Sequence, residues 1–231
     1  MMFNPDDPKT WGCFRPLIFA HDVGRSRDRS TAVIGGVAPF DPNLVGIQEA
    51  HELRQGLYGS ARASDLAEID RYYDSEALIV ADLSNDPTYA EVLFETFGRR
   101  VVGLQISRHG DGMNLERRPV KHGVMPVYTA GRSYLLELYH SLLQSGQVRI
   151  VEGPTTRRAY EQLMGLETEM RESGIVYSCP SGQHDDLGIS CAMLAWAARH
   201  PHLSLWVRNG EFARRPPRSP RPPNFSSRAW T

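Results

Sequence analysis

The segment HDDLG, residues 184–188, opens an apolar run that continues through residue 198. Ile189, Met193 and Trp196 recur in this run at helical spacing, and small residues fill the gaps, so the pattern predicts a helix over 184–199. An acidic pair ahead of a helix is a common start signal, because unpaired N–H groups and the positive end of the helix dipole favour carboxylates. The alternative is that Asp185 and Asp186 contribute carboxylate ligands to a metal site.

Two other acids stand at the ends of apolar, strand-like runs. Asp22 follows the run 16–20 after one histidine, and Asp82 follows the run 77–81 directly. The continuous apolar character of 77–81 is typical of a strand that is covered on both faces. Each acid could simply open a turn, but the occurrence of all three acidic sites at element ends favours a shared role.

The surrounding pattern predicts an α/β fold with a mixed sheet. Strands at 16–20, 31–37 and 44–50, joined by short turns, predict an antiparallel meander. Helices and strands then alternate, with residues 108–127 left as a loop or short hairpin. The expected elements are a helix from Ala63 to Tyr73 with Ser64 as N-cap, a helix over 88–97, a strand over 100–107, a helix over 133–144, a strand over 148–151, a long helix over 155–172 and a strand over 175–179.

Composition limits the classes of function. The 231 residues carry 26 basic and 27 acidic side chains, which argues against a strongly basic nucleic-acid binder, although a local basic face is compatible with this balance. Three cysteines without CxxC spacing argue against a zinc knuckle or a disulfide framework and favour a reducing cytoplasm. We see no signal peptide or membrane span. We expect one domain over 1–210 and a disordered, basic, proline-rich tail over 211–231.

Carboxylates that crowd into one place require cations or raised pKa values, because like charges repel. If the first strand is central and the strand 77–81 lies beside it, Asp22 and Asp82 leave the sheet at neighbouring positions. A late helix that begins at Asp185 and crosses the sheet would add a third carboxylate. Oxygen ligands with high negative charge select Mg²⁺ or Mn²⁺, and two such ions can activate a water and stabilise a leaving oxygen in phosphodiester cleavage.

The motifs in this order resemble the nuclease domain of phage terminase large subunits, which has a ribonuclease H-like fold. Residues 19–33 (FAHDVGRSRDRSTAV) are similar to its first strand, metal-binding acid and glycine-containing turn. Residues 79–82 resemble the second acidic motif, and residues 182–187 with the alanine-rich helix resemble the third. The resemblance spans roughly residues 16–200 and implies a ribonuclease H-like sheet of five or more strands flanked by helices.

The resemblance also implies a metal-dependent endonuclease that acts on double-stranded DNA. It assigns metal binding and catalysis to Asp22, Asp82, Asp185 and Asp186 with a two-ion Mg²⁺ or Mn²⁺ site, and it leaves open which of the adjacent pair binds directly. Four further residues are expected near the acids or on DNA phosphates, and for most of them a structural or solvated role is the alternative: His184, Arg25, Arg27 and Arg132.

One departure concerns energy supply. Terminase large subunits also contain an ATPase, but the sequence has no GxxxxGK[ST] phosphate-binding loop. If the chain is complete, as Met1 suggests, we expect in the cytoplasm of a bacterial host either a nuclease that works with a separately encoded ATPase and a portal-type assembly, or a stand-alone or decayed relative of these nucleases. The alternatives are another ribonuclease H-like nuclease of the resolvase or transposase type, and a non-catalytic packaging module.

Overall fold

The computed structural model describes residues 17–24, 29–38, 41–73, 77–171, 174–180 and 184–203. The expected tail over 211–231 lies outside these residues. The elements follow in the order β1 (Leu17–Asp22), β2 (Thr31–Val37), β3 (Val45–Glu52), α1 (Gly59–Tyr72), β4 (Leu78–Asp82), α2 (Tyr89–Phe97), the short 3-10 helix η2 (Gly98–Arg100), β5 (Val101–Ser107), β6 (Asp111–Val120), β7 (Gly123–Gly131), α3 (Arg132–Gln144), β8 (Val148–Ile150), α4 (Pro154–Met164), β9 (Glu167–Arg171), β10 (Gly174–Ser178) and α5 (Asp186–Arg199).

Most strands form one mixed sheet with β1 near its middle. The order is β6-β7-β5-β4-β1-β2-β3-β8, eight strands in all. Strands β1, β2 and β3 pair antiparallel, which confirms the predicted meander, and β4 pairs parallel with β1, as expected for a central first strand. The predicted α/β class with a mixed sheet of five or more strands is therefore confirmed.

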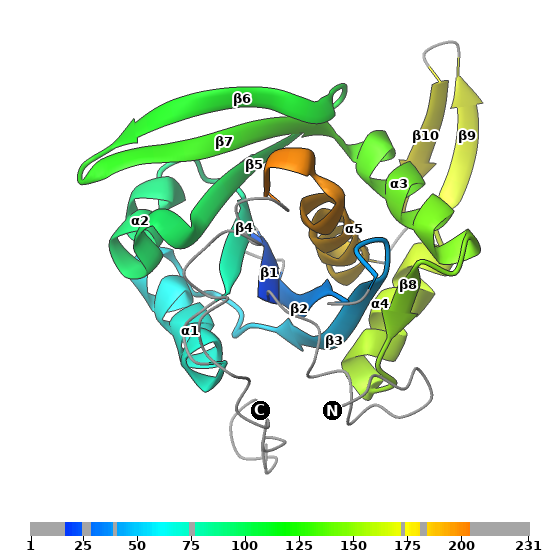
Figure 1. Cartoon of the computed structure of the whole chain (residues 1–231), viewed down its shortest axis with the longest axis horizontal. Helices are drawn as coiled ribbons and strands as arrows, with labels where there is room; N and C mark the ends of the chain where they lie inside the picture. The colour runs from blue at the N-terminus through cyan, green and yellow to red at the C-terminus, as the bar shows by residue number, and fades with distance from the viewer. Residues whose placement is uncertain are drawn as a thin grey trace.

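The sheet curves around α5, and helices cover both of its faces (Figure 1). Along β1, Ile18 and Ala20 belong to the core on the α5 side, while Leu17 and Phe19 belong to the core that α1 and α2 cover. This alternation follows from the period of two along a strand. Residues 187–198 of α5 are all buried, because this helix lies between the sheet and the flanking helices α3 and α4.

Three local expectations were wrong. The helix predicted over 155–172 ends at Met164, and Glu167–Arg171 instead forms β9, which pairs with β10 in a separate two-stranded sheet. Gly165 follows the helix, and glycine is a poor helix former.

The second error concerns the start of α1. This helix begins at Gly59, well before the predicted N-cap Ser64, and buried Arg62 in its first turn donates to the carbonyl of Leu57 at 2.9 Å.

The third error concerns residues 108–127, which were expected to be a loop or a short hairpin. They contribute to a long hairpin, β6 and β7, whose strands form one edge of the main sheet. Gly110 and Gly112, with φ of 134° and 75°, allow the chain to turn at the start of β6. Most side chains of β6 are exposed, so the strand has no apolar run by which the sequence could have revealed it.

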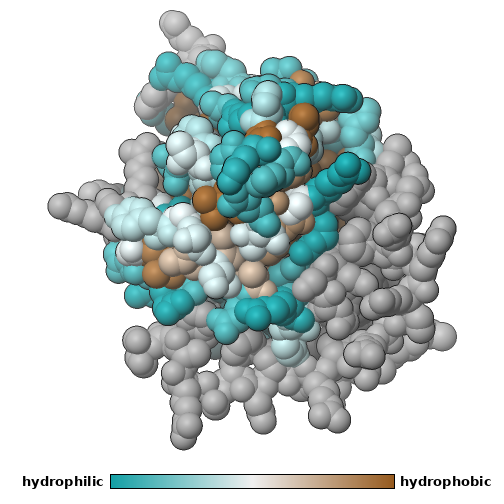
Figure 2. All heavy atoms as spheres, turned by 90° about the vertical axis from the view of Figure 1, so that its left-hand side faces the viewer, coloured by the Kyte–Doolittle hydropathy of each residue, from teal (hydrophilic) through white to brown (hydrophobic). Residues whose placement is uncertain are grey.

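The surface beside α1 and α2 mixes polar and apolar side chains. Figure 2 shows this side, where apolar residues are interspersed among hydrophilic ones. None of the described helices combines the length and the apolar character that crossing a bilayer requires.

Helix α5 approaches the sheet closely at Gly35 in β2. A Cβ atom added there would lie 2.0 Å from the carbonyl oxygen of Gly46 and 3.1 Å from Leu194 in α5. The β2–β3 register also shifts between Ile34 and Gly35, so the backbone here is already irregular. A side chain at this position must push strand β3 or α5 away.

We therefore expect Gly35→Ala to destabilise the protein by about 1–3 kcal/mol, the usual cost of overpacking a core. Thermal or urea unfolding measures this change. Gly188→Ala in α5 is the control, because its Cβ would lie an ordinary 3.6 Å from the backbone nitrogen of Leu163 and alanine favours a helix. Equal stability of the two variants would contradict the close approach.

Candidate metal centre

Strands β1 and β4 bring two of the predicted acids side by side. The parallel register pairs His21 with Ala81, so Asp22 and Asp82, the final residues of the two strands, lie at the same edge of the sheet. Both point to the α5 face, because they follow Ala20 and Val80 by two residues. Asp22 is 8% exposed and Asp82 is 4% exposed, so burial makes both charges costly.

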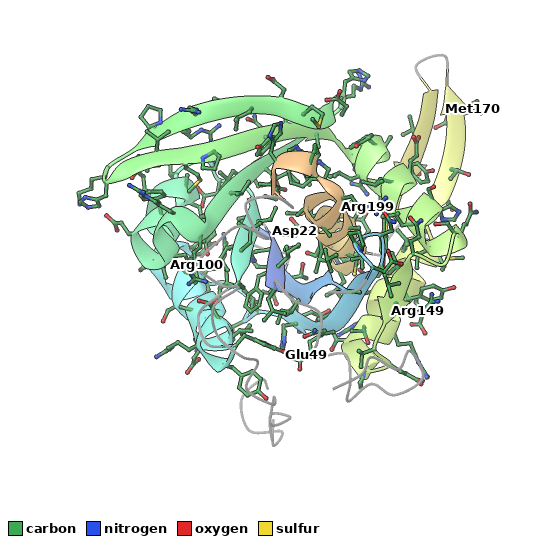
Figure 3. The ribbon with its side chains drawn as sticks, viewed as in Figure 1. Asp22, Glu49, Arg100, Arg149, Met170 and Arg199 are labelled. Atoms are coloured by element: carbon green, nitrogen blue, oxygen red, sulfur yellow. The ribbon has the colours of Figure 1, made fainter. Side chains whose placement is uncertain are left out.

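Helix α5 adds the third acidic position to the same edge. Thr31 of β2 pairs with Asp22 across the antiparallel ladder. The Thr31 hydroxyl lies 3.2 Å from the backbone oxygen of Asp186 and 2.7 Å from the Ser190 hydroxyl. These contacts fix the first turn of α5 over the end of β1. Figure 3 shows Asp22 at the centre of the view, beside β1 and α5.

The start of α5 is capped by a residue from another helix. Gln162 of α4 accepts hydrogen bonds on Oε1 from the backbone N–H groups of Leu187 at 3.0 Å and Gly188 at 3.2 Å. Asp185 occupies the N-cap position without a side-chain cap bond. Asp185 therefore does not act as a hydrogen-bonding cap for the described helix, which weakens the helix-start explanation of this residue.

The two adjacent acids have different surroundings. The Arg132 guanidinium, at the first residue of α3, forms an ion pair with the Asp185 carboxylate. The charge of Asp186 instead acts on Asp22, where it raises the pKa. Asp185 is thus the partner of a basic residue, and Asp186 is the acid of the pair whose charge acts on Asp22.

Burial, and for Asp22 also like charge, disfavours ionised carboxylates at this edge. Burial raises the pKa of Asp22 well above its ordinary value, and the charges of Asp82 and Asp186 raise it further, against an opposing effect of Arg132. Burial also raises the pKa of Asp82, although hydrogen bonds from the Ser84 hydroxyl at 2.5 Å and the Ser84 N–H at 2.9 Å stabilise its charged form. Excess negative charge is therefore concentrated where the three acids meet.

The donor set fits a hard divalent cation. Asp22, Asp82 and Asp186 supply only carboxylate oxygens, which suit Mg²⁺ or Mn²⁺, and a cation would relieve their mutual repulsion. Among the residues that the structure describes, no group of three or more acidic, histidine or cysteine side chains stands in ligand geometry. The parallel register of β1 and β4 and the docking of α5 on Thr31 place the three acids at one edge of the sheet.

Other polar contacts stabilise the two loops that follow Asp22 and Asp82. Asn85 donates to the carbonyl of Val23 at 3.4 Å, which links the loops directly. Arg62 donates to the carbonyl of Gly24 at 3.3 Å and lies over the ring of Tyr89, 5.2 Å from its centroid. These contacts were missed from the sequence, as was the cap by Gln162, because no local pattern marks residues whose partners are distant along the chain.

The remaining predicted residues have different outcomes. Arg132 lies at the acidic edge, where its charge reaches Asp22. His184 is exposed and lines a cavity next to Asp186. Arg25 and Arg27 lie outside the described residues, so their predicted contacts stay predictions.

Solved structures share this architecture. The large terminase nuclease from thermophilic phage G20c is 19% identical, with a TM-score of 0.53 over 78% of this chain and 81% of that chain. Its magnesium-bound form, also 19% identical, gives 0.54 over 79% and 82%. The large terminase nuclease domain from bacteriophage SPP1 with bound Mn is 13% identical and gives 0.50 over 81% and 88%. No family model and no curated protein matches the sequence.

At these identities the likeness establishes the fold. The chain shares the fold of these large terminase nucleases, which confirms at the level of the fold the resemblance that the sequence motifs indicated.

The raised pKa of Asp22 predicts that this carboxylate destabilises the metal-free protein at neutral pH. A carboxyl group whose pKa is higher in the folded than in the unfolded state favours folding at low pH, and this contribution is lost as the pH rises through the folded-state pKa. Asp22→Asn should therefore raise the melting temperature in EDTA at pH 7.5, and the gain should shrink as the pH is lowered toward 4. A lower melting temperature of the variant at pH 7.5 would contradict the buried, repelled carboxylate.

Proposed function

We propose that this protein is a divalent-metal-dependent endonuclease that cleaves double-stranded DNA, with Asp22, Asp82 and Asp186 as its metal ligands. The observation that carries the proposal is the convergence of these acids at one edge of the sheet, with Asp22 and Asp82 in neighbouring parallel strands. The solved nucleases of the same fold support it, since one holds magnesium and another holds manganese.

The chemistry would be hydrolysis of a phosphodiester bond. Two Mg²⁺ or Mn²⁺ ions bound by the acids would lower the pKa of a water and stabilise the negative charge of the leaving oxygen. Of the adjacent acids, we assign ligation to Asp186 and the binding of Arg132 to Asp185, because the charge of Asp186 reaches Asp22 whereas Asp185 forms the ion pair.

The chain's own residues would orient these ligands. Ser84 holds the Asp82 carboxylate through its hydroxyl and N–H, and the same hydroxyl accepts a hydrogen bond from the N–H of Ile106 in β5 at 2.6 Å. Thr31 holds the Asp186 backbone against the end of β1. Arg132 would place positive charge beside the site, where it can attract the phosphate of the substrate.

The biological role that fits such an endonuclease is DNA packaging in a phage or prophage. The solved structures of the same fold are nucleases of large terminases. In that role, an ATPase and a portal-type assembly would translocate the DNA, and this protein would cleave it.

We expect the purified protein to nick or linearise supercoiled plasmid in Mn²⁺, and Asp22→Asn, Asp82→Asn and Asp186→Asn each to lower the rate at least 100-fold, because each removes a charged ligand. Agarose gels over time measure the rates. The matched control is Asp41→Asn, whose carboxylate caps the N–H of Asn43 in a turn. That turn binds Arg199 at the opposite end of α5.

Three outcomes would contradict the proposal in different ways. Cleavage that survives all three substitutions would refute the assigned site. A folded wild type without cleavage would favour a non-catalytic packaging module. Faster cleavage of four-way junctions than of plain duplex would favour a resolvase-type nuclease.

Metal binding can be measured without cleavage. Millimolar Mn²⁺ should raise the melting temperature of the wild type, because a ligand that binds only the folded state stabilises it, and each kcal/mol is worth about 2–4 °C at this size. Asp22→Asn and Asp186→Asn should lose this shift, while Asp185→Asn should keep most of it. A shift that depends on Asp185 and not on Asp186 would reverse the assignment of the pair.

A further inference from the structure

A cavity of about 530 Å³ opens beside Asp186 and continues away from the acidic edge. Its walls come from the start of β2, the end of β3 and the helices α4 and α5. The charged or polar residues that matter for its chemistry are Arg29, Thr31, Glu52, Arg158, His184 and Asp186. The cavity therefore joins one of the proposed metal ligands to two arginines, Arg29 and Arg158, that the proposed function does not use.

Glu52 holds two arginines in this cavity. Its carboxylate oxygens lie 2.8 Å from Nη1 of Arg29 and 3.2 Å from Nη1 of Arg158. The Glu52 side chain is 17% exposed, whereas those of Arg29 and Arg158 are 58% and 49% exposed. One mostly buried carboxylate thus anchors two guanidinium groups that remain open to solvent.

The sheet register sets the position of this pair relative to the acids. Thr31 pairs with Asp22 on one side and with Glu52 on the other. Residues that are directly opposite in antiparallel strands point to the same face, so Asp22, Thr31 and Glu52 form one row on the α5 face. Two strand spacings separate Asp22 from Glu52, about 10 Å. Successive phosphates of one DNA strand rise about 3.4 Å along the helix axis, so groups that are about 10 Å apart reach phosphates at most about three nucleotides from each other.

We propose that Arg29 and Arg158, held by Glu52, bind the backbone phosphates of the DNA strand a few nucleotides from the bond that is cut. This inference rests on the proposed function and names the substrate contact of that site. Guanidinium groups bind phosphate through paired, charge-assisted hydrogen bonds.

The other charges in the cavity favour a polymer over a small free anion. Glu52, Glu161 and Asp186 line the same space, so their carboxylates repel an isolated phosphate. A DNA backbone is held at many points, and it can place a phosphate on the arginines while the neighbouring acids hold cations. The anchoring carboxylate keeps the guanidinium groups in place before DNA arrives, which lowers the entropy lost on binding.

The test measures DNA binding separately from cleavage. Fluorescence anisotropy with a labelled 20-base-pair duplex in Ca²⁺, with the duplex checked by gel to be intact, gives the affinity at several salt concentrations. We expect Arg29→Ala and Arg158→Ala each to weaken binding about fivefold or more and to lower the salt slope by about 0.9, the value for one lost phosphate contact. Arg158→Lys should recover the salt slope and part of the affinity, because it keeps the charge without the paired hydrogen bonds.

Arg157→Ala is the matched control. Arg157 stands next to Arg158 on α4, is similarly exposed, and pairs with Glu152 instead of lining the cavity. It should change affinity less than twofold, with all variants keeping the wild-type melting temperature.

Two results would overturn the inference: equal effects of Arg157→Ala and Arg158→Ala, or no binding of the duplex by the wild type. Neither depends on the cleavage assay. If the arginine variants bind DNA weakly but cleavage survives substitution of the three acids, the proposed phosphate contact is supported and the assigned metal site is refuted. If cleavage requires the acids but the arginine variants bind normally, only the phosphate contact fails.

Discussion

The placement of three carboxylates at one poorly solvated edge of the sheet is the constraint on which this structure depends. Asp22 and Asp82 end neighbouring parallel strands with little access to solvent, and Asp186 approaches the same edge from α5. A protein gains no stability from such an arrangement without cations, because burial and like charge both disfavour ionised carboxylates. The rest of the fold must therefore hold these groups together against their own electrostatics.

The surrounding contacts perform this task from several elements. Thr31 fastens the first turn of α5 to the sheet, and Gln162 of α4 satisfies the first backbone N–H groups of that helix. Because Gln162 supplies the cap, the acidic residues at the helix start are not needed for it. Arg132 offsets part of the negative charge through Asp185. Helix α5 itself is buried along its length, so its position is set by packing against the sheet.

Several elements could be predicted from sequence because their signals are local. The meander, the apolar strand β4 and the helix after the acidic pair follow from residue periodicity, and the acids stand at their ends. The helix expected over 155–172 failed, because its second half pairs with β10, and a partner strand outweighs helical propensity. The long β6–β7 hairpin was also underestimated, since β6 is an exposed edge strand with no apolar run to reveal it.

The sequence by itself determined which reactive side chains are present and where they stand along the chain. These are acids at the ends of strands and at the start of a buried helix, in an order that resembles one nuclease fold. Only the tertiary structure decided which groups meet. Strand register put Asp22 beside Asp82, the Arg132 ion pair distinguished Asp185 from Asp186, and the β2–β3 ladder aligned Glu52 and its arginines with the acidic edge. The reason is physical: periodicity along a chain is a local property, whereas register, ion pairing and helix docking join residues that are far apart in sequence.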